Sequence, residues 1–345
     1  MAWLWMVGLS WPAWAAQDRI CLSLDRLPAD GRVVARVDLT EAARWCGQTI
    51  QPERLRAFVL PESNSVPAQF VPDPHRPGAG VIVLQCKSAA GPVRVCLDFS
   101  GPAAPKPPSQ TSVRTRWFTL QHDPKAMGGL PTAVTFTHTG WQVPGLHWND
   151  RLYHRQAGSF ALRYDPEPQV QCLATGPVCT VMRVRARYTQ PDGRQPASQP
   201  EVVYDWFYFH DQPLVLVRGM ARQQSPQPWH EAHFLELAFA TNAFAHWVGG
   251  EPRQEGTFAG RDQPHRFSQW ALVRQGANAL GLFEAGPVVV YDGRSYGPYL
   301  HADADAAWRQ WSSAAWERTA WLWIGPVTDP AAAESAATAS TGPLT

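Results

Sequence analysis

The stretch WHEAHFLELAF, residues 229–239, places two histidines and two glutamates among side chains suited to a protein core. His230 and His233 are three residues apart, whereas a zinc-protease helix needs two histidines four apart with a glutamate directly after the first. The spacing therefore excludes that helix. A histidine beside a carboxylate is still a pair that can orient a hydroxyl group or transfer its proton.

As a β-strand, the stretch would present its side chains alternately to two faces. Glu231 and His233 would lie on one face and Glu236 on the other. Both faces become apolar toward residue 239, which indicates a strand whose first residues emerge at a rim or cleft. Because Phe234 and Ala238 flank Glu236 on its face, its carboxylate must be paired or must titrate high.

Arg218 or Arg222 on the preceding strand is the expected partner of Glu236. Structural pairing is the first interpretation of this carboxylate, and a catalytic role is the second. For His233, the alternative to an acid–base role is a rim histidine that hydrogen-bonds a neighbour. Further catalytic candidates, if the sheet brings them near, are His265 and His301.

Aromatic side chains are unusually common, with 17 tryptophans in 345 residues. Indole and phenol rings suit stacking on the apolar faces of sugar rings, although many of these tryptophans must be core. Positions near turns suit stacking best. We therefore expect sugar contacts from Trp148, Trp247, Tyr296 and Tyr299.

Composition narrows the classes of function. A net charge of +1 without any basic cluster argues against nucleic-acid binding. No phosphate loop or dinucleotide motif is present, so we expect no nucleotide cofactor. Asp303 and Asp305 in HADAD are the one candidate pair for calcium, but without a glycine-containing ligand loop a solvated turn is the default. We predict no cofactor and no metal.

The first 16 residues are apolar and contain Ala13 and Ala15 in the pattern of a signal-peptidase site, which predicts export to the periplasm or the medium and no membrane attachment afterwards. Six cysteines fit an oxidising compartment. Short spacings favour Cys172–Cys179 and Cys86–Cys96, which leaves Cys21 with Cys46; buried free thiols are the alternative. No pair has the two-residue spacing of a zinc knuckle.

The chain is expected to be all-β in two parts. Short strand-like runs over 17–99, with one helix at TEAARW capped by Thr40, predict a small β-barrel or sandwich. A proline-rich linker over 100–112 follows. Residues 113–325 contain more than ten strand-like runs without helices, which predicts a large antiparallel supersandwich. The Ala/Ser/Thr-rich tail over 326–345 should be disordered.

The order of RICLSLDRLPADG, LRAFVL, SVPAQFVPDP, GVIVLQC and VRVCLDF resembles the small N-terminal β-barrel of bacterial polysaccharide lyases of the exo-rhamnogalacturonan lyase type. WHEAHFLELAF, HRFSQWALVRQGANALGLFEAG and VVVYDG resemble the galactose-mutarotase-like supersandwich that follows in those enzymes. Many such lyases carry much of their catalytic machinery on a helical toroid, for which this sequence has no segment.

The resemblance implies a secreted protein that handles a polysaccharide or oligosaccharide, with β-elimination next to a uronate as the reaction if it is a lyase. His233 would then be the base, and Arg155 or Arg266 would neutralise the substrate carboxylate. Two alternatives stay open: a non-catalytic glycan-binding or scaffold module, and a mutarotase-like sugar epimerase. The sequence does not determine the oligomeric state.

Overall fold

The computed structural model describes residues 20–24, 27, 31–47, 49–61, 64–87, 91–250, 253–283, 287–302 and 310–327. The predicted signal segment, the tail from residue 328, the Asp303/Asp305 pair and the side chain of Cys46 lie outside these residues. The prediction of an all-β chain is confirmed, because antiparallel sheets dominate the fold. No helix in the described ranges is long and apolar enough to span a bilayer.

Two compact units make up the chain. Among the described residues, one contains those up to Pro107 together with Ala174–Cys179, and the other contains Pro108–Leu173 and those from Thr180 to residue 327. The division therefore falls inside the proline-rich segment.

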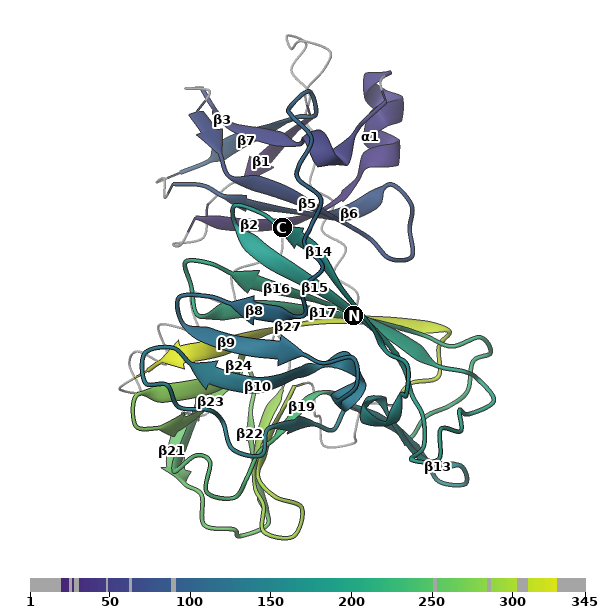
Figure 1. Cartoon of the computed structure of the whole chain (residues 1–345), viewed down its shortest axis with the longest axis vertical. Coiled ribbons are helices and arrows are strands. Elements are labelled where there is room, and N and C mark those ends of the chain that lie inside the picture. The colour runs from purple at the N-terminus through teal and green to yellow at the C-terminus, as the bar shows by residue number, and fades with distance from the viewer. Residues whose placement is uncertain are drawn as a thin grey trace. The chain divides into compact units, whose positions relative to one another are not determined.

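The first unit contains two antiparallel sheets and the helix α1 (Leu39–Cys46) (Figure 1). Its four-stranded sheet has the order β1 (Ile20–Leu24), β7 (Val93–Asp98), β3 (Arg56–Leu60), β4 (Asn64–Val66). Its three-stranded sheet has the order β2 (Arg32–Asp38), β6 (Ala79–Gln85), β5 (Ala68–Pro72). A 3₁₀ turn, η1, covers Pro52–Arg54. Buried aliphatic side chains of both sheets, among them Ile82 and Val95, form the core.

The N-cap of helix α1 lies two residues before the predicted one. The Asp38 carboxylate accepts hydrogen bonds from the amides of Thr40 and Glu41, at 3.0 and 3.1 Å, so Asp38 and not Thr40 is the N-cap. Gly47 ends the helix in the left-handed region, at φ 66°.

A disulfide joins Cys21 of β1 to Cys96 of β7, which face each other across the ladder. The predicted pairing of Cys86 with Cys96 is wrong, because β6, which ends just before Cys86, and β7 belong to different sheets. The predicted pairing of Cys21 with Cys46 is also wrong, because Cys21 is bonded to Cys96. Cys86 is a buried thiol.

The predicted bridge between Cys172 and Cys179 is also absent. The amide of Gly176 donates to the carbonyl of Cys179 at 3.1 Å, so Pro177 and Val178 form a two-residue turn. Cys179 therefore lies opposite Gly176 in the hairpin, and the four-residue loop that would bring it to Cys172 does not form. Cys172 and Cys179 are buried thiols.

The second unit contains four antiparallel sheets. The largest has nine strands in the order β14 (Gln169–Thr175), β15 (Cys179–Arg187), β16 (Glu201–Phe209), β17 (Leu214–Arg222), β27 (Ala315–Pro326), β24 (Asn278–Phe283), β23 (Trp270–Gln275), β20 (His246–Gly250), β21 (Gln254–Thr257). A five-stranded sheet has the order β11 (His147–Trp148), β19 (Phe234–Ala238), β26 (Tyr299–Ala302), β25 (Val288–Asp292), β22 (Gln263–Phe267).

Two three-stranded sheets complete this unit. One has the order β10 (Pro131–Phe136), β9 (Phe118–His122), β8 (Ser112–Arg114), and the other β13 (Gly158–Ala161), β12 (Arg151–His154), β18 (Glu231–Ala232). Two 3₁₀ turns, η2 (Met127–Gly129) and η3 (Leu162–Tyr164), lie between strands.

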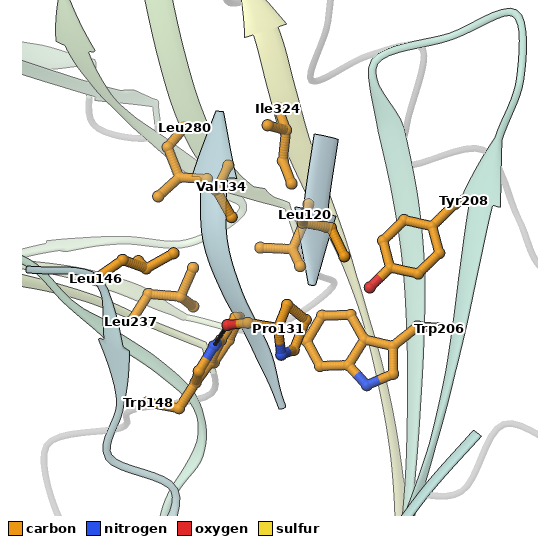
Figure 2. Close-up of a pocket in the computed structure, with 11 residues that line it drawn as sticks. Leu120, Pro131, Val134, Leu146, Trp148, Trp206, Tyr208, Leu237, Leu280 and Ile324 are labelled. Carbon is orange, nitrogen blue, oxygen red and sulfur yellow. Dashed lines mark hydrogen bonds between the residues drawn. The ribbon is translucent and has the colours of Figure 1, made fainter. Parts of the chain in front are cut away.

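One apolar core is shared by all four sheets of the second unit. Trp148 packs edge-on against Trp206 with 5.2 Å between the ring centroids, and its indole N–H donates to the carbonyl of Pro131. Figure 2 shows these rings beside an apolar cavity of about 10 Å³, lined also by Leu237 and Leu280. A cavity of that size holds one water at most, so the centre of the sandwich is filled by side chains and any ligand must bind elsewhere.

The disulfide gives a first testable prediction. Replacing both Cys21 and Cys96 by serine should lower the free energy of unfolding by about 2–4 kcal/mol, because the bond closes a long loop of the unfolded chain; the two cysteines are 75 residues apart. Urea unfolding with and without dithiothreitol measures the effect. The reductant should shift the wild-type midpoint and leave the double variant unchanged, and an equal shift in both would contradict the assignment.

Candidate functional site

The stretch WHEAHFLELAF does not form one continuous strand. Glu231 belongs to β18, which pairs with β12, whereas Phe234 and Glu236 belong to β19, which pairs with β11 and β26. The register of β19 against β26 shifts between Phe234 and Glu236, and Leu235 between them has a φ of 53°. This β-bulge turns Glu236 to the side of His233, so the predicted separation of the two on opposite faces is wrong.

Asp150 holds the bulge in place. Its carboxylate accepts the backbone N–H groups of Leu235 and Glu236 at 2.9 and 3.0 Å, and also the hydroxyl of Tyr204 at 2.5 Å. Asp150 is fully buried. A left-handed conformation is costly for leucine, and the two amide bonds to one carboxylate stabilise it.

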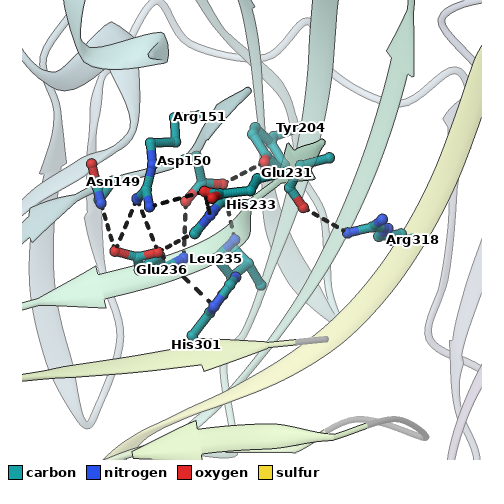
Figure 3. A network of polar contacts seen from close by, with 11 residues as sticks. Asn149, Asp150, Arg151, Tyr204, Glu231, His233, Leu235, Glu236, His301 and Arg318 are labelled. Carbon is teal, nitrogen blue, oxygen red and sulfur yellow. Dashed lines mark hydrogen bonds and ion pairs between the residues drawn. The ribbon is translucent and has the colours of Figure 1, made fainter. Parts of the chain in front are cut away.

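Glu236 accepts hydrogen bonds from three side chains (Figure 3). The amide of Asn149 donates to one carboxylate oxygen at 2.5 Å, and Nη1 of Arg151 contacts both oxygens at 3.3 and 3.4 Å. Nδ1 of His233 forms a short hydrogen bond to the second oxygen. The expectation that a buried Glu236 must be paired is therefore met by Arg151. The predicted partners are not used: Arg218 pairs with Glu317 of β27 instead.

His233 lies between two carboxylates. While Nδ1 faces Glu236, Nε2 is 3.0 Å from Oε2 of Glu231. Two carboxylate acceptors satisfy an imidazole whose ring nitrogens both donate. Nη2 of Arg151 reaches the same Glu231 oxygen at 3.4 Å, so Arg151 and His233 each bridge the two glutamates.

Accessibility changes sharply across this cluster. The side chains of His233 and Glu236 are 1% and 4% exposed, whereas those of Glu231 and Arg151 are 25% and 23% exposed. A ligand can therefore touch Glu231 and Arg151 directly, while Glu236 lies behind them. The chain Glu231–His233–Glu236 leads from the surface to a buried carboxylate.

Charge and burial act in opposite directions on the two glutamates. Burial is the largest influence on Glu236 and disfavours its charged form, but the hydrogen bond from His233 and the charges of His233 and Arg151 outweigh it and hold its pKa well below the ordinary value. At Glu231 the hydrogen bond from His233 is the largest influence and lowers the pKa. Both carboxylates are therefore ionised at neutral pH.

His301 completes the buried part of the cluster. It lies opposite Glu236 in the β19–β26 ladder, and its ring stacks parallel on that of His233 with 4.7 Å between centroids. Its Nδ1 is 3.9 Å from the carboxylate of Glu236. Burial, followed by the neighbouring charge of His233, lowers the pKa of His301 to about 3, so this imidazole is neutral at pH 7.

His233, Glu236 and His301 could offer a metal ion three ligand atoms within 4.8 Å of one another. The guanidinium of Arg151 lies 3.3 Å from the same Glu236 oxygen. A second cation there would be repelled by this charge and would have to displace the His233 hydrogen bond. The donor set therefore fits a hydrogen-bonded acid–base cluster better than a metal centre.

Other residues selected from the sequence lie away from this cluster. His265 falls between Pro264 and Arg266 on β22 and alternates to the other face of the sheet, where it stacks on Trp247 at 4.0 Å. Trp247 and Trp148 are 4% and 2% exposed. They pack in the core and present no open ring face to a sugar.

The remaining selected residues are more accessible. Tyr299 is half-buried on β26, two residues before His301 and on the same face. Arg266 is exposed on β22, in the cross-strand row that runs from Glu236 through His301 and Val289. Three interstrand spacings separate it from Glu236, roughly 14 Å. Arg155 and Tyr296 are exposed.

Sequence reasoning missed Asn149, Asp150 and Arg151. Asp150 accepts the hydrogen bonds of the bulge, and Asn149 and Arg151 donate to Glu236. Their signal is the run of three polar residues in HWNDR directly after the short strand β11. Only its aromatic neighbour Trp148 was predicted to take part in a site. Pairing of β11 with β19 and of β12 with β18 brings it to the WHEAHFLELAF segment.

Comparison with known proteins shows a shared fold. No protein-family model and no curated protein sequence matches the chain. A glycosyl hydrolase family 38 protein and an α-mannosidase, both from Enterococcus faecalis, are similar in structure over 94% of this chain, with TM-scores of 0.56 and 0.53 and 9% identity. A galactose mutarotase related enzyme from Lactobacillus acidophilus aligns over 63% of this chain and 98% of its own, with a TM-score of 0.42 and 7% identity.

The chain spans 44% and 43% of the two Enterococcus proteins. At 9% identity the similarity establishes the fold, a β-sandwich architecture that occurs in carbohydrate-active enzymes. It assigns neither a substrate nor a reaction.

The buried histidines predict how stability depends on pH. Burial lowers the pKa of His122 and His301 from 6.5 to about 4 and about 3, so the unfolded chain binds these protons more tightly and stability falls as the pH drops below 6.5. Asp150 acts oppositely: burial raises its pKa from 3.8 to about 6, and its contribution grows as the pH falls. With two groups against one, urea unfolding should show decreasing stability from pH 6.5 to 4.5.

His301→Gln should make that decrease smaller, and the exposed His246→Gln should leave it unchanged. A decrease of the same size in His301→Gln as in the wild type would contradict the role of His301. Glu236 does not interfere in this window, since its lowered pKa affects stability only below the ordinary value of 4.5.

The Asp150 contacts generate a local prediction. Asp150→Asn turns one acceptor into a donor that faces a backbone N–H, which should cost about 1–3 kcal/mol. Hydrogen exchange of the Leu235 and Glu236 amides should accelerate more than that of the β17 amides. Asp211→Asn, an exposed control, should change neither, and unaltered exchange at Leu235 in the Asp150 variant would show that the bulge stands without the carboxylate.

Proposed function

We propose that this chain is a carbohydrate-handling protein that binds a glycan where strands β12 and β18 adjoin β19, that Glu231 and Arg151 contact the sugar there, and that the Glu231–His233–Glu236 chain moves a proton. The observation that carries the proposal is His233 held between one accessible and one buried carboxylate. Hydroxyl groups of a sugar match the acceptors of Glu231 and the donors of Arg151.

The relay has a definite direction. His233, protonated at both ring nitrogens, can give its Nε2 proton to Glu231, which passes it on to a sugar oxygen, while the Nδ1 proton stays hydrogen-bonded to Glu236. Asn149 and Arg151 keep Glu236 oriented, and the neutral ring of His301 covers His233 without adding charge. The fold similarity to an α-mannosidase and a glycosyl hydrolase family 38 protein supports carbohydrate as the ligand class.

β-Elimination next to a uronate is the reaction class that we propose within this function. An exposed Arg266 on the face of Glu236 supports it, because this guanidinium can pair with a substrate carboxylate. To act as the base, His233 would first have to give its Nε2 proton to Glu231 and then take the substrate proton at that nitrogen. Arg151 already pairs with Glu231 and Glu236, so it is less suited than Arg266 to bind a substrate carboxylate. A Cys21–Cys96 disulfide supports an exported protein.

Binding and reaction can be tested on one panel of galacturonate and mannose oligomers. Isothermal titration calorimetry measures affinity, and ultraviolet absorbance follows the unsaturated products of elimination. Glu231→Gln should weaken binding about tenfold or more through loss of a charged hydrogen-bond acceptor. Glu255→Gln, an exposed glutamate on β21, is the matched control and should bind as the wild type.

The outcomes separate the alternatives. Binding without new absorbance would contradict the lyase and support the glycan-binding module. A change in the optical rotation of a free hexose that is faster with the protein than without it would favour the epimerase. Equal affinity of the wild type and Glu231→Gln for the best ligand would contradict the site.

A further inference from the structure

A second feature of the five-stranded sheet is the loop that joins β25 to β26, residues 293–298. Its Tyr296 is 83% exposed and is the one large apolar side chain left exposed among the residues that the structure describes. Most of the tryptophans that the structure describes are buried. A single exposed ring is ordinary in itself, so the way in which the loop holds Tyr296 decides whether it is a candidate ligand contact.

The loop is held by Asp262, which precedes β22. Its carboxylate accepts the amides of Arg294 and Ser295 at 2.7 and 3.0 Å, the hydroxyl of Ser295 at 3.0 Å and that of Tyr291 at 3.2 Å. The hydrogen bonds from Ser295 and Arg294 lower the pKa of Asp262 to about 2. These four bonds hold the residues just before Tyr296, and the carbonyl of Pro298, just after it, accepts the amide of Phe239 at 3.2 Å.

Asp262 is itself in a costly conformation, with a φ of 53°. The segment just before Asp262 is also held by hydrogen bonds, because the buried carboxylate of Asp292 accepts the amides of Ala259 and Gly260 at 2.9 and 2.7 Å. Two aspartates thus tie both loops at this end of the sheet. The backbone that carries Tyr296 is therefore held in one conformation, so that stacking of its ring on a ligand costs little conformational entropy.

Aromatic rings connect this loop to the candidate site. His301 contacts Tyr299 with 6.5 Å between centroids, Tyr299 stacks on Tyr291 at 4.9 Å, and Tyr291 donates to Asp262. Tyr299 and Tyr291 are half-buried, so each keeps part of its ring accessible. Strands β19 to β22 span three interstrand spacings, roughly 14 Å, which is longer than one sugar ring.

We infer that the ligand is an oligosaccharide or polysaccharide chain, which runs from Glu231 and Arg151 along Tyr299 and Tyr291 and stacks a distal sugar ring on Tyr296. This inference rests on the proposed function and goes beyond it, because a monosaccharide would reach the polar cluster but not Tyr296. Exposed Arg294 beside Tyr296 adds a donor for ring substituents.

Affinity as a function of chain length tests the inference. The probes are galacturonate and mannose as monomer, trimer and hexamer, titrated by calorimetry into the full chain. Tyr296→Ala should weaken hexamer binding about five- to tenfold, the value of one aromatic contact, and leave monomer binding unchanged. Tyr296→Phe keeps the ring and should bind the hexamer as the wild type.

Asp262→Ala should weaken hexamer binding in the same direction by releasing the loop. Asp192→Ala removes a carboxylate that holds an exposed turn elsewhere, through the amide and guanidinium of Arg194, and serves as the matched control. Near-ultraviolet circular dichroism and the urea midpoint establish that each variant is folded.

Each result is decisive. Equal hexamer affinity of Tyr296→Ala and the wild type, with Glu231→Gln still impaired, overturns the tyrosine path and leaves the proposed function intact. An equal loss for monomer and hexamer in Tyr296→Ala also overturns it, since the effect would not come from a distal ring. Absence of binding for every length in the wild type overturns the proposed function and this inference together.

Discussion

A carboxylate buried in an apolar sandwich must be neutralised where it lies, and the arrangement around Glu236 follows from that constraint. The ionised group needs a cation and several donors, because burial alone would raise its pKa. Arg151, Asn149 and His233 supply them. His233 directly precedes β19 in the chain, and strand pairing brings Asn149 and Arg151 to it. The charge balance of the site therefore depends on the sheet topology.

The bulge at Leu235 links the sheet topology to the charge balance of the site. Without it, regular alternation would direct Glu236 away from His233, and the imidazole would have one carboxylate partner instead of two. Asp150 stabilises the bulge from below through two backbone amides and is supported by Tyr204. The buried Asp150 thus fixes the position of the Glu236 carboxylate through the backbone amide of Glu236.

Much of the fold could be predicted because its signals are local. In β15, Met182, Val184 and Ala186 are buried while the arginines between them are half-buried, as the alternation indicates. The disulfide and the partner of Glu236 could not be obtained this way. Cys21 meets Cys96, and Glu236 meets Arg151, through pairings of strands distant in sequence. Nothing in the residues near Glu236 specifies which arginine the strand order will deliver.

The same distinction separates the predicted sugar contacts that are accessible in the structure from those that are buried. Tyr296 and Tyr299 stand near turns and remain accessible, whereas Trp148 and Trp247, chosen by the same criterion, are core. A position near a turn indicates that the backbone lies at the surface, but it does not indicate that the side chain points outward. What separates Tyr296 from those tryptophans is the pair of aspartates that hold its loop. The left-handed backbone of Asp262 costs free energy, and the hydrogen bonds to its carboxylate offset that cost, so the loop holds the ring before any ligand binds.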